Sequence, residues 1–139
     1  MTEPNCLFCR IIQGEIPSHQ IYEDDNWLAF LDLHPVNLGH ALVVPKQHCR
    51  NLFDLPANLT NKLGPVLQKL AGAVKSGTQA DGLNVIWNNE RAAGQIIFHA
   101  HVHLIPRFAG DDFEPWHGSG DETVDDFLRA QKAIKEILA

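Results

Sequence analysis

The segment FHAHVHLIPR, residues 98–107, places His99, His101 and His103 at alternate positions. Imidazole can ligate a metal, attack an electrophile or transfer a proton near neutral pH, so this group of three predicts a chemical site. In a β-strand, alternate side chains share one face. We therefore expect the three rings on one face and the intervening apolar side chains on the other, in a core: Phe98, Ala100, Val102 and Leu104.

The spacing of these histidines limits what they can bind. At a rise of about 3.3 Å per residue, neighbouring histidines lie roughly 6 to 7 Å apart and the outer two roughly 13 Å apart. Because zinc binds imidazole nitrogen at about 2.0 Å, the three rings cannot share one ion, although two neighbours could. A two-histidine metal site, a catalytic pair with a third polar residue, and a solvated strand face therefore all remain open.

A second group that could do chemistry is the pair Cys6-x-x-Cys9. Redox pairs of this spacing usually open a helix just after a strand, and no strand is expected before this pair, so the spacing favours a metal site. Two unmodified thiols are the alternative. With 3 cysteines in the chain a disulfide framework is not expected, and we expect the third, Cys49, to be a small buried residue.

Other polar residues could converge on the histidine segment. His40 opens the segment HALVVP, and His48 closes the following PKQH. The loop before the histidines carries Asn88, Asn89 and Gln95, whose amides are good donors to phosphate or sugar oxygens. This combination makes a solvated strand face with accidental histidines a weaker interpretation than a functional site.

The elements that must position these residues follow from periodicity. Helical spacing predicts a short helix over 7–13 that stops at Gly14, and a long helix over 56–77 with Asp54 as its N-cap and a kink or restart at Pro65. Further apolar residues mark an amphipathic C-terminal helix over about 122–138, after a polar, glycine-containing stretch. Strands are predicted over 21–25, 26–32, 40–45, 83–89 and 95–106, the last being the longest.

Composition places further limits on the protein. The length of 139 residues fits one domain, and strands that come in runs favour the α+β class with an antiparallel sheet. The net charge of −6, without a basic patch, argues against a nucleic-acid-binding protein. No apolar window approaches the roughly 20 residues that cross a bilayer, and no signal peptide is evident, so we expect a soluble, cytoplasmic protein.

Taken together, these motifs resemble the histidine triad (HIT) family of nucleotidyl hydrolases and transferases, in its Hint-like branch. The family signature, His-φ-His-φ-His-φ-φ, reads HAHVHLI from His99 onward. The resemblance extends over about 6–117 through the segments CLFCRIIQGEIPS, IYEDDNWLAFLDLHPVNLGHALVVPKQH and GLNVIWNNERAAGQIIFHAHVHLIPR. It implies a single domain, residues 1–139, with a five-stranded antiparallel sheet, a long helix and a C-terminal helix.

The resemblance implies an activity on purine nucleoside phosphoramidates or related AMP conjugates. In this family the middle histidine, here His101, attacks the α-phosphorus and forms a nucleotidyl-histidine that water then hydrolyses. His40 and His103 would hydrogen-bond the phosphate oxygens or fix the ring of His101. Asn88 and Gln95 match amide side chains near the phosphate and the leaving group.

Other implied contacts concern the nucleoside. Asp32 matches the carboxylate that accepts the ribose hydroxyls, and an apolar pocket for the base would comprise Phe8, Ile11, Ile16 and Phe30. Two features depart from the family pattern: Ile96 stands where a Ser or Thr is common, and LIPR is similar to the dinucleoside polyphosphate hydrolases of the same superfamily. Such a hydrolase, a catalytic-zinc hydrolase and a purine-nucleotide-binding module with little turnover are the alternative functions.

The resemblance also implies a metal and a partner. The cysteine pair of some bacterial members completes a zinc site with two histidines, and here that set is Cys6, Cys9, His48 and His99. Four such ligands fill a tetrahedral shell, so one structural Zn²⁺ per chain is expected. The family forms a homodimer through the long helix and an edge strand, with a continuous ten-stranded sheet. Trp116 and His117 lie where the family's C-terminal segment approaches the partner's active site.

Overall fold

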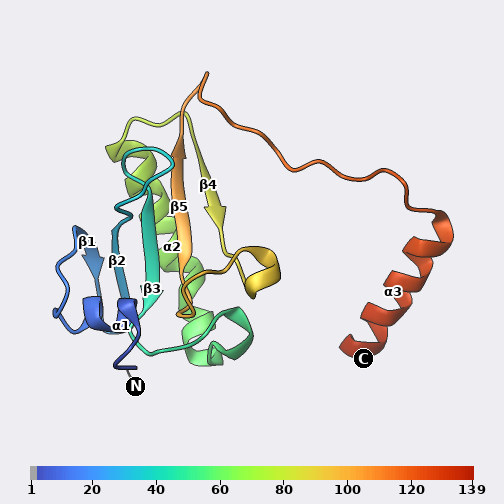
Figure 1. Cartoon of the computed structure of the whole chain (residues 1–139), viewed down its shortest axis with the longest axis horizontal. Coiled ribbons are helices and arrows are strands. Elements are labelled where there is room, and N and C mark those ends of the chain that lie inside the picture. The colour runs from blue at the N-terminus through green and yellow to red at the C-terminus, as the bar shows by residue number, and fades with distance from the viewer. Residues whose placement is uncertain (1–2) are drawn as a thin grey trace.

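Residues 3–139 are described by the computed structural model. Five strands form one antiparallel sheet in the order β1-β2-β3-β5-β4 (Figure 1). The arrangement confirms the predicted α+β class and the predicted antiparallel sheet. The bounds of the strands are β1 Gln20–Glu23, β2 Trp27–Leu31, β3 Ala41–Pro45, β4 Gly82–Ile86 and β5 Val102–Arg107.

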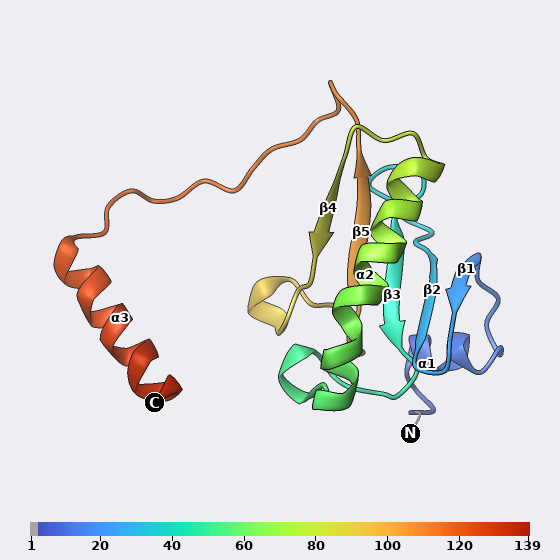
Figure 2. The same cartoon turned by 180° about the vertical axis from the view of Figure 1, so that it is seen from behind.

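Helices cover both faces of this sheet. α2 lies along one face, as Figure 2 shows, and α1 lies against the other. Short 3-10 helices, η1 and η2, stand before α2 and after β4, and α3 follows the last strand. The bounds of the helices are α1 Leu7–Ile12, η1 Leu52–Asp54, α2 Ala57–Gly77, η2 Arg91–Ala93 and α3 Val124–Leu138.

The core consists of two layers, one on each face of the sheet. Successive side chains of a strand point to opposite faces, so β2 and β3 contribute to both layers. The layer under α2 is built by helix residues at helical spacing, which pack on the strands: Leu59, Leu63, Val66, Leu70 and Val74. The layer under α1 contains Phe8, Ile11, Leu28, Phe30, Leu42 and Val44. The second layer lies next to the histidines and forms the floor of the site.

The start of α2 differs from the sequence-based expectation. Asp54 does not cap α2, because it ends η1 and forms a capping box there with Asn51. The long helix begins after Pro56, which occupies its N-cap. Pro65 lies inside the helix without interrupting it. Since Pro65 is on the exposed side, water can solvate the carbonyl that loses its amide partner.

The predicted long strand over 95–106 is mostly not a strand. β5 begins only at Val102, and residues 95–101 approach it in an irregular conformation. The predicted alternation of faces is nevertheless present. The rings of His99 and His101 lie against Phe8, with centroids 5.9 and 5.1 Å away, whereas Ala100 joins the layer under α2. Phe98 is a further exception to the expected core, since it is half-buried beneath the Arg91 guanidinium, 5.6 Å away.

The predicted C-terminal helix is present but lies away from the sheet. After Arg107 the chain leaves the body, and an arm without regular structure, residues 112–123, leads to α3 beyond the β4 edge (Figures 1 and 2). None of the residues of α3 is buried. Of the helices in residues 3–139, none is both long enough and apolar enough to span a membrane.

Candidate catalytic pocket and metal cluster

One open pocket of about 530 Å³ lies on the α1 face of the sheet. Most of the residues predicted to bind a nucleotide line it: Phe8, Ile11, Ile16, Phe30, Asp32, Asn88, His101 and His103. Its walls come from α1, the end of β2, the loop after β4 and the histidine segment. His40 and Gln95 do not line it, and both are buried behind the pocket wall. The pocket therefore combines an apolar lining with imidazole, carboxylate and amide groups.

The position of the His101 proton follows from a backbone contact. Its Nδ1 lies 2.7 Å from the carbonyl oxygen of His99, and a carbonyl can only accept, so Nδ1–H is the donor. The lone pair of neutral His101 is therefore on Nε2. Burial lowers the pKa of His101, while the charge of Asp32 opposes that shift. A largely neutral imidazole with an oriented Nε2 lone pair has the state required of a nucleophile.

His40 and His103 form a relay whose direction is also set by the backbone. The Val36 amide donates to His40 Nδ1 at 3.1 Å, so the proton of neutral His40 is on Nε2. His40 Nε2 lies 2.9 Å from His103 Nδ1 and donates to it. The remaining proton of neutral His103 is then on Nε2, where it can donate to a ligand in the pocket. Burial lowers the pKa of His40 and lowers that of His103 to about 4, so both rings are neutral at pH 7.

Asp32 lies beside this relay at the end of β2. One of its carboxylate oxygens accepts from the His34 amide at 2.9 Å, and the other lies 3.7 Å from His40 Nε2. The side chain is partly exposed and lines the pocket. Asp32 is therefore held in place by its own loop while it faces the pocket.

The predicted metal ligands converge at the N-terminal end of the histidine segment. Cys6 Sγ and Cys9 Sγ lie 3.4 and 3.5 Å from His99 Nδ1, and Cys9 Sγ lies 3.4 Å from His48 Nδ1. For tetrahedral zinc, with Zn–S about 2.3 Å and Zn–N about 2.0 Å, the expected S–N separation is about 3.5 Å. His99 Nε2–H donates to the Pro45 carbonyl at 2.8 Å, which leaves the Nδ1 lone pair directed at the sulfurs. The four side chains fit a structural zinc ion.

A second group of possible ligands does not fit a metal in the same way. Asp32, His40 and His103 also bring one ligand atom each within 4.8 Å of one another. However, the Val36 amide uses the lone pair on His40 Nδ1, so Nε2 must keep its proton unless the ring becomes an imidazolate. His40 and His103 therefore form a hydrogen-bonded pair, and Asp32 lies beside it without a hydrogen bond to either ring. Within residues 3–139, no group of three or more ligands contains two of the three segment histidines, as the catalytic-zinc alternative required.

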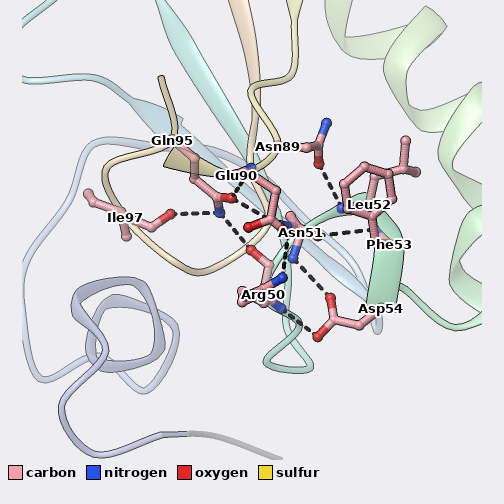
Figure 3. A network of polar contacts seen from close by, with 9 residues as sticks. All are labelled: Arg50, Asn51, Leu52, Phe53, Asp54, Asn89, Glu90, Gln95 and Ile97. Atoms are coloured by element: carbon pink, nitrogen blue, oxygen red, sulfur yellow. Dashed lines mark hydrogen bonds and ion pairs between the residues drawn. The ribbon is translucent and has the colours of Figure 1, made fainter. Parts of the chain in front are cut away.

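Gln95 is buried within the protein and does not line the pocket. Its side chain is 2 % exposed and makes four hydrogen bonds within the protein (Figure 3). These bonds use both amide protons and the amide oxygen, so they do not support the predicted contact of Gln95 with a phosphate. Asn51, one of its partners, is fully buried, and nothing in the spacing of the sequence singled it out. Ile96, in contrast, is 86 % exposed at the pocket rim.

Comparison with known proteins finds one domain family and several similar proteins. A profile of the HIT domain matches residues 13–110. The "Protein hit" of Bacillus subtilis is 44% identical over 138 residues, which cover 97% of this chain and 95% of that protein. The adenosine 5′-monophosphoramidase HNT1 of Candida albicans is 38% identical over 107 residues, which cover 74% of this chain and 70% of that protein.

Solved structures show the same fold. The crystal structure of SMU.412c from Streptococcus mutans matches with a TM-score of 0.92 and 41% identity, over 99% of this chain and 88% of that one. A zinc-bound histidine triad family protein from Mycobacterium smegmatis matches with a TM-score of 0.74 and 38% identity, over 97% of this chain and 98% of that one.

Proposed function

The chain belongs to the HIT family, and we propose that it is a nucleotidyl hydrolase or transferase that acts on purine nucleoside phosphoramidates or related AMP conjugates. The observation that carries this proposal is the oriented Nε2 lone pair of His101 in a pocket that also presents His103. The phosphoramidase relative, whose name states that activity, supports the substrate class.

The reaction begins with attack on phosphorus. His101 Nε2 forms a bond to the α-phosphorus as the P–N bond to the leaving group breaks, and the departing nitrogen keeps the electron pair and takes up a proton from solvent. The Nδ1–H of His101 remains hydrogen-bonded to the His99 carbonyl, which stabilises the positive charge that the ring acquires. Water then attacks the same phosphorus and gives up a proton to solvent, the bond between phosphorus and Nε2 breaks, and AMP is released with the lone pair back on Nε2.

Donors around the phosphorus stabilise the transition state. His103 Nε2–H points into the pocket because its Nδ1 is occupied by His40, so the relay presents a donor to a phosphate oxygen. Asn88, from the loop after β4, would provide a second donor. Ile96 has no hydroxyl to offer, so it would not make the contact that a Ser or Thr would make.

The nucleoside fits the remaining walls of the pocket. Asp32 is placed to accept hydrogen bonds from the ribose hydroxyls, and the apolar lining can enclose a flat base between Phe8, Ile11, Ile16 and Phe30. The pocket therefore supports recognition of a purine nucleotide by its base and sugar as well as its phosphate.

One zinc ion per chain is part of the proposal. Cys6, Cys9, His48 and His99 would hold it with the separations given above. A closed shell of four protein ligands supplies a structural cross-link and no catalytic position. It would tie α1 to the histidine segment, and the zinc-bound Mycobacterium smegmatis relative supports this assignment.

We also propose a homodimer. β4 is an edge strand of the sheet, and Val85 on it is 51 % exposed. Nearby apolar side chains are open to solvent, among them Phe53 at 73 %. Trp87 Nε1 is buried without a hydrogen-bond partner among residues 3–139. Pairing of β4 with a second copy would cover this edge and extend the sheet to ten strands.

The arm supports the same assembly. α3 exposes an apolar stripe, in which Phe127 and Ile134 are 65 % and 60 % exposed, and it lies beyond the β4 edge (Figure 1). Residues 109–139, which comprise the arm and α3, make up more than a fifth of the chain. The match to the Streptococcus mutans crystal structure covers 99% of the chain with a TM-score of 0.92, so it includes a similarly placed C-terminal segment. A second copy paired through β4 would lie where α3 can pack on it. The arm would then carry Trp116 and His117 toward the partner.

Activity assays on adenosine 5′-phosphoramidate test the proposed function. Wild-type protein is expected to release AMP, and His101→Ala is expected to bind AMP without turnover. Faster hydrolysis of a dinucleoside polyphosphate would transfer the assignment to that class. AMP binding with no turnover of either substrate would indicate a binding module. Loss of kcat on chelation, measured at saturating substrate in protein that stays folded, would favour a catalytic metal.

A further inference from the structure

The segment before β5 is held by something other than the sheet. The first residues of β5 that pair with neighbouring strands are Val102 and His103. The His99 carbonyl, which orients His101, therefore lies on a backbone without strand partners. The Ala100 amide donates to the Cys49 carbonyl at 2.7 Å, so the segment after PKQH is one support. A second support must fix the residues between Gln95 and His99.

Gln95 provides this second support with both ends of its amide (Figure 3). Nε2 donates to the Ile97 carbonyl at 3.1 Å and to the Arg50 carbonyl at 2.7 Å. Oε1 accepts from the Glu90 amide at 2.9 Å. This side chain thus connects the histidine segment and the loop after β4 to the backbone at Arg50. Its hydrogen bonds take the place of the strand pairing that residues 95–101 lack.

Asn51 fixes the orientation of Gln95. Because Gln95 Oε1 already accepts from a backbone amide, Asn51 must present its own Nδ2, which donates at 3.1 Å. The second Nδ2 proton goes to Glu90 Oε1 at 3.2 Å, and Oδ1 accepts from the Phe53 amide at 3.1 Å. The side chain is fully buried, and its amide oxygen and both of its amide protons are used.

The loop that Asn51 holds is strained and lines the pocket. Glu90 has a φ of +76°, which costs about 1–3 kcal/mol for a residue other than glycine. Its carboxylate is held by Asn51 and by an ion pair with Arg50. The same loop delivers Asn88 to the pocket. Without these contacts the strain would favour a different loop conformation.

We propose that Asn51 is a positioning residue for nucleotidyl transfer. Through Gln95 it places the backbone that carries the His99 carbonyl, and through Glu90 it places the loop that carries Asn88. It touches no substrate. This inference rests on the proposed function only for its effect on rate, because the orientation of His101 can be measured in the absence of any reaction.

The test separates positioning from folding by two substitutions. Asn51→Ser keeps an oxygen that can accept from the Phe53 amide, and serine is a good N-cap, but it cannot reach Gln95 or Glu90. Asn51→Asp keeps the shape and that acceptor and loses both donors. Asp54→Ala is the matched control, because it removes the other half of the same capping box without contacting the loop after β4.

Two measurements are made on these full-length proteins. With adenosine 5′-phosphoramidate, kcat of both Asn51 variants should fall about 100-fold, the size expected for a misplacement of about 1 Å, while KM stays within about threefold. In ¹⁵N spectra of the imidazoles, wild-type His101 should be protonated at Nδ1 alone. In Asn51→Ser the signals of its two nitrogens should move toward each other, since both tautomers become populated.

The outcomes are distinct. A single Nδ1–H tautomer of His101 in both Asn51 variants, or an equal loss of kcat in Asp54→Ala, would overturn the positioning role. Absence of turnover by the wild type would remove the proposed function, and the imidazole spectra would then decide the inference alone. If Asn51→Ser is too unstable to measure, the same two measurements on Asn51→Asp decide the question.

Discussion

Backbone groups fix the protonation state of the histidines in this site. The carbonyls of His99 and Pro45 require donors, and the Val36 amide requires an acceptor, so the rings of His101, His99 and His40 are each left with one available state. The same rule separates His99, whose Nδ1 lone pair is available to the proposed zinc ion, from His40, whose Nε2 must carry a proton. Histidines that look equivalent in the sequence are therefore left with different atoms available for binding or attack.

The buried histidines make stability depend on pH. The pKa of His103 is about 4 in the folded protein, against an ordinary value of 6.5. A base with a lowered folded pKa binds its proton more readily when unfolded, so the free energy of unfolding should fall as the pH drops from about 6.5 to about 4. In that window His103→Asn should reduce the slope, by at most about 1.4 kcal/mol per pH unit.

Denaturant titrations at several pH values would measure this slope. Both proteins keep the cysteine–histidine cluster, so its own protonation contributes equally to each. Equal slopes for the wild type and His103→Asn would show that His103 is not held neutral by the fold.

Among the elements, α1 depends most on its surroundings. It has six residues, too few to form a stable helix alone, and it supplies Phe8 and Ile11 to the pocket. The contacts of Cys6 and Cys9 with His48 and His99 connect it to the sheet. The proposed zinc ion would therefore shape the base-binding end of the pocket and leave the chemistry to His101.

Removal of one zinc ligand should mainly affect nucleotide binding. Cys9→Ser is expected to lower the zinc content from one equivalent per chain and to raise KM by about tenfold, the effect of losing about 1.4 kcal/mol of apolar contact with the base. Cys49→Ala, which removes a buried thiol outside the cluster, should retain zinc and KM. Full activity with an unchanged KM in zinc-free protein would contradict this role for α1.

The sequence predicted the elements better than their boundaries. Alternation and helical spacing depend on local pattern, so the five strands, α2 and α3 could be identified. The break before Val102 could not, because the bonds from Asn51, Gln95 and Cys49 that replace the ladder join residues about 45 to 50 positions apart. For the same reason Gln95 was expected to bind phosphate, and Asn51 was missed.

In the molecule as a whole, α3 buries none of its residues against the other described parts of the chain. A 15-residue helix is marginal in water, yet this one has a capping box at Thr123 and an exposed apolar stripe. In the proposed homodimer, the second copy paired with β4 would give this apolar stripe a surface to pack on.

Charge placed on the apolar stripe should weaken the dimer. Ile134→Glu is expected to raise the dimer dissociation constant at least about tenfold, because burial of an isoleucine side chain contributes about 1.5–3 kcal/mol. Ala133→Glu adds the same charge on another side of the helix and should have little effect. Sedimentation over a range of concentrations would measure both, and a wild-type monomer of 15.5 kDa at micromolar concentration would contradict the assembly.

The central claim, covalent catalysis by His101, is tested most directly by stereochemistry at phosphorus. The substrate is an adenosine 5′-phosphoramidate with sulfur in place of one oxygen, of known configuration, and the hydrolysis is run in ¹⁸O-labelled water. Attack by His101 followed by attack of water inverts the phosphorus twice, so the product should have retained configuration. Inverted configuration would show that water attacks directly, and it would contradict a nucleotidyl-histidine intermediate.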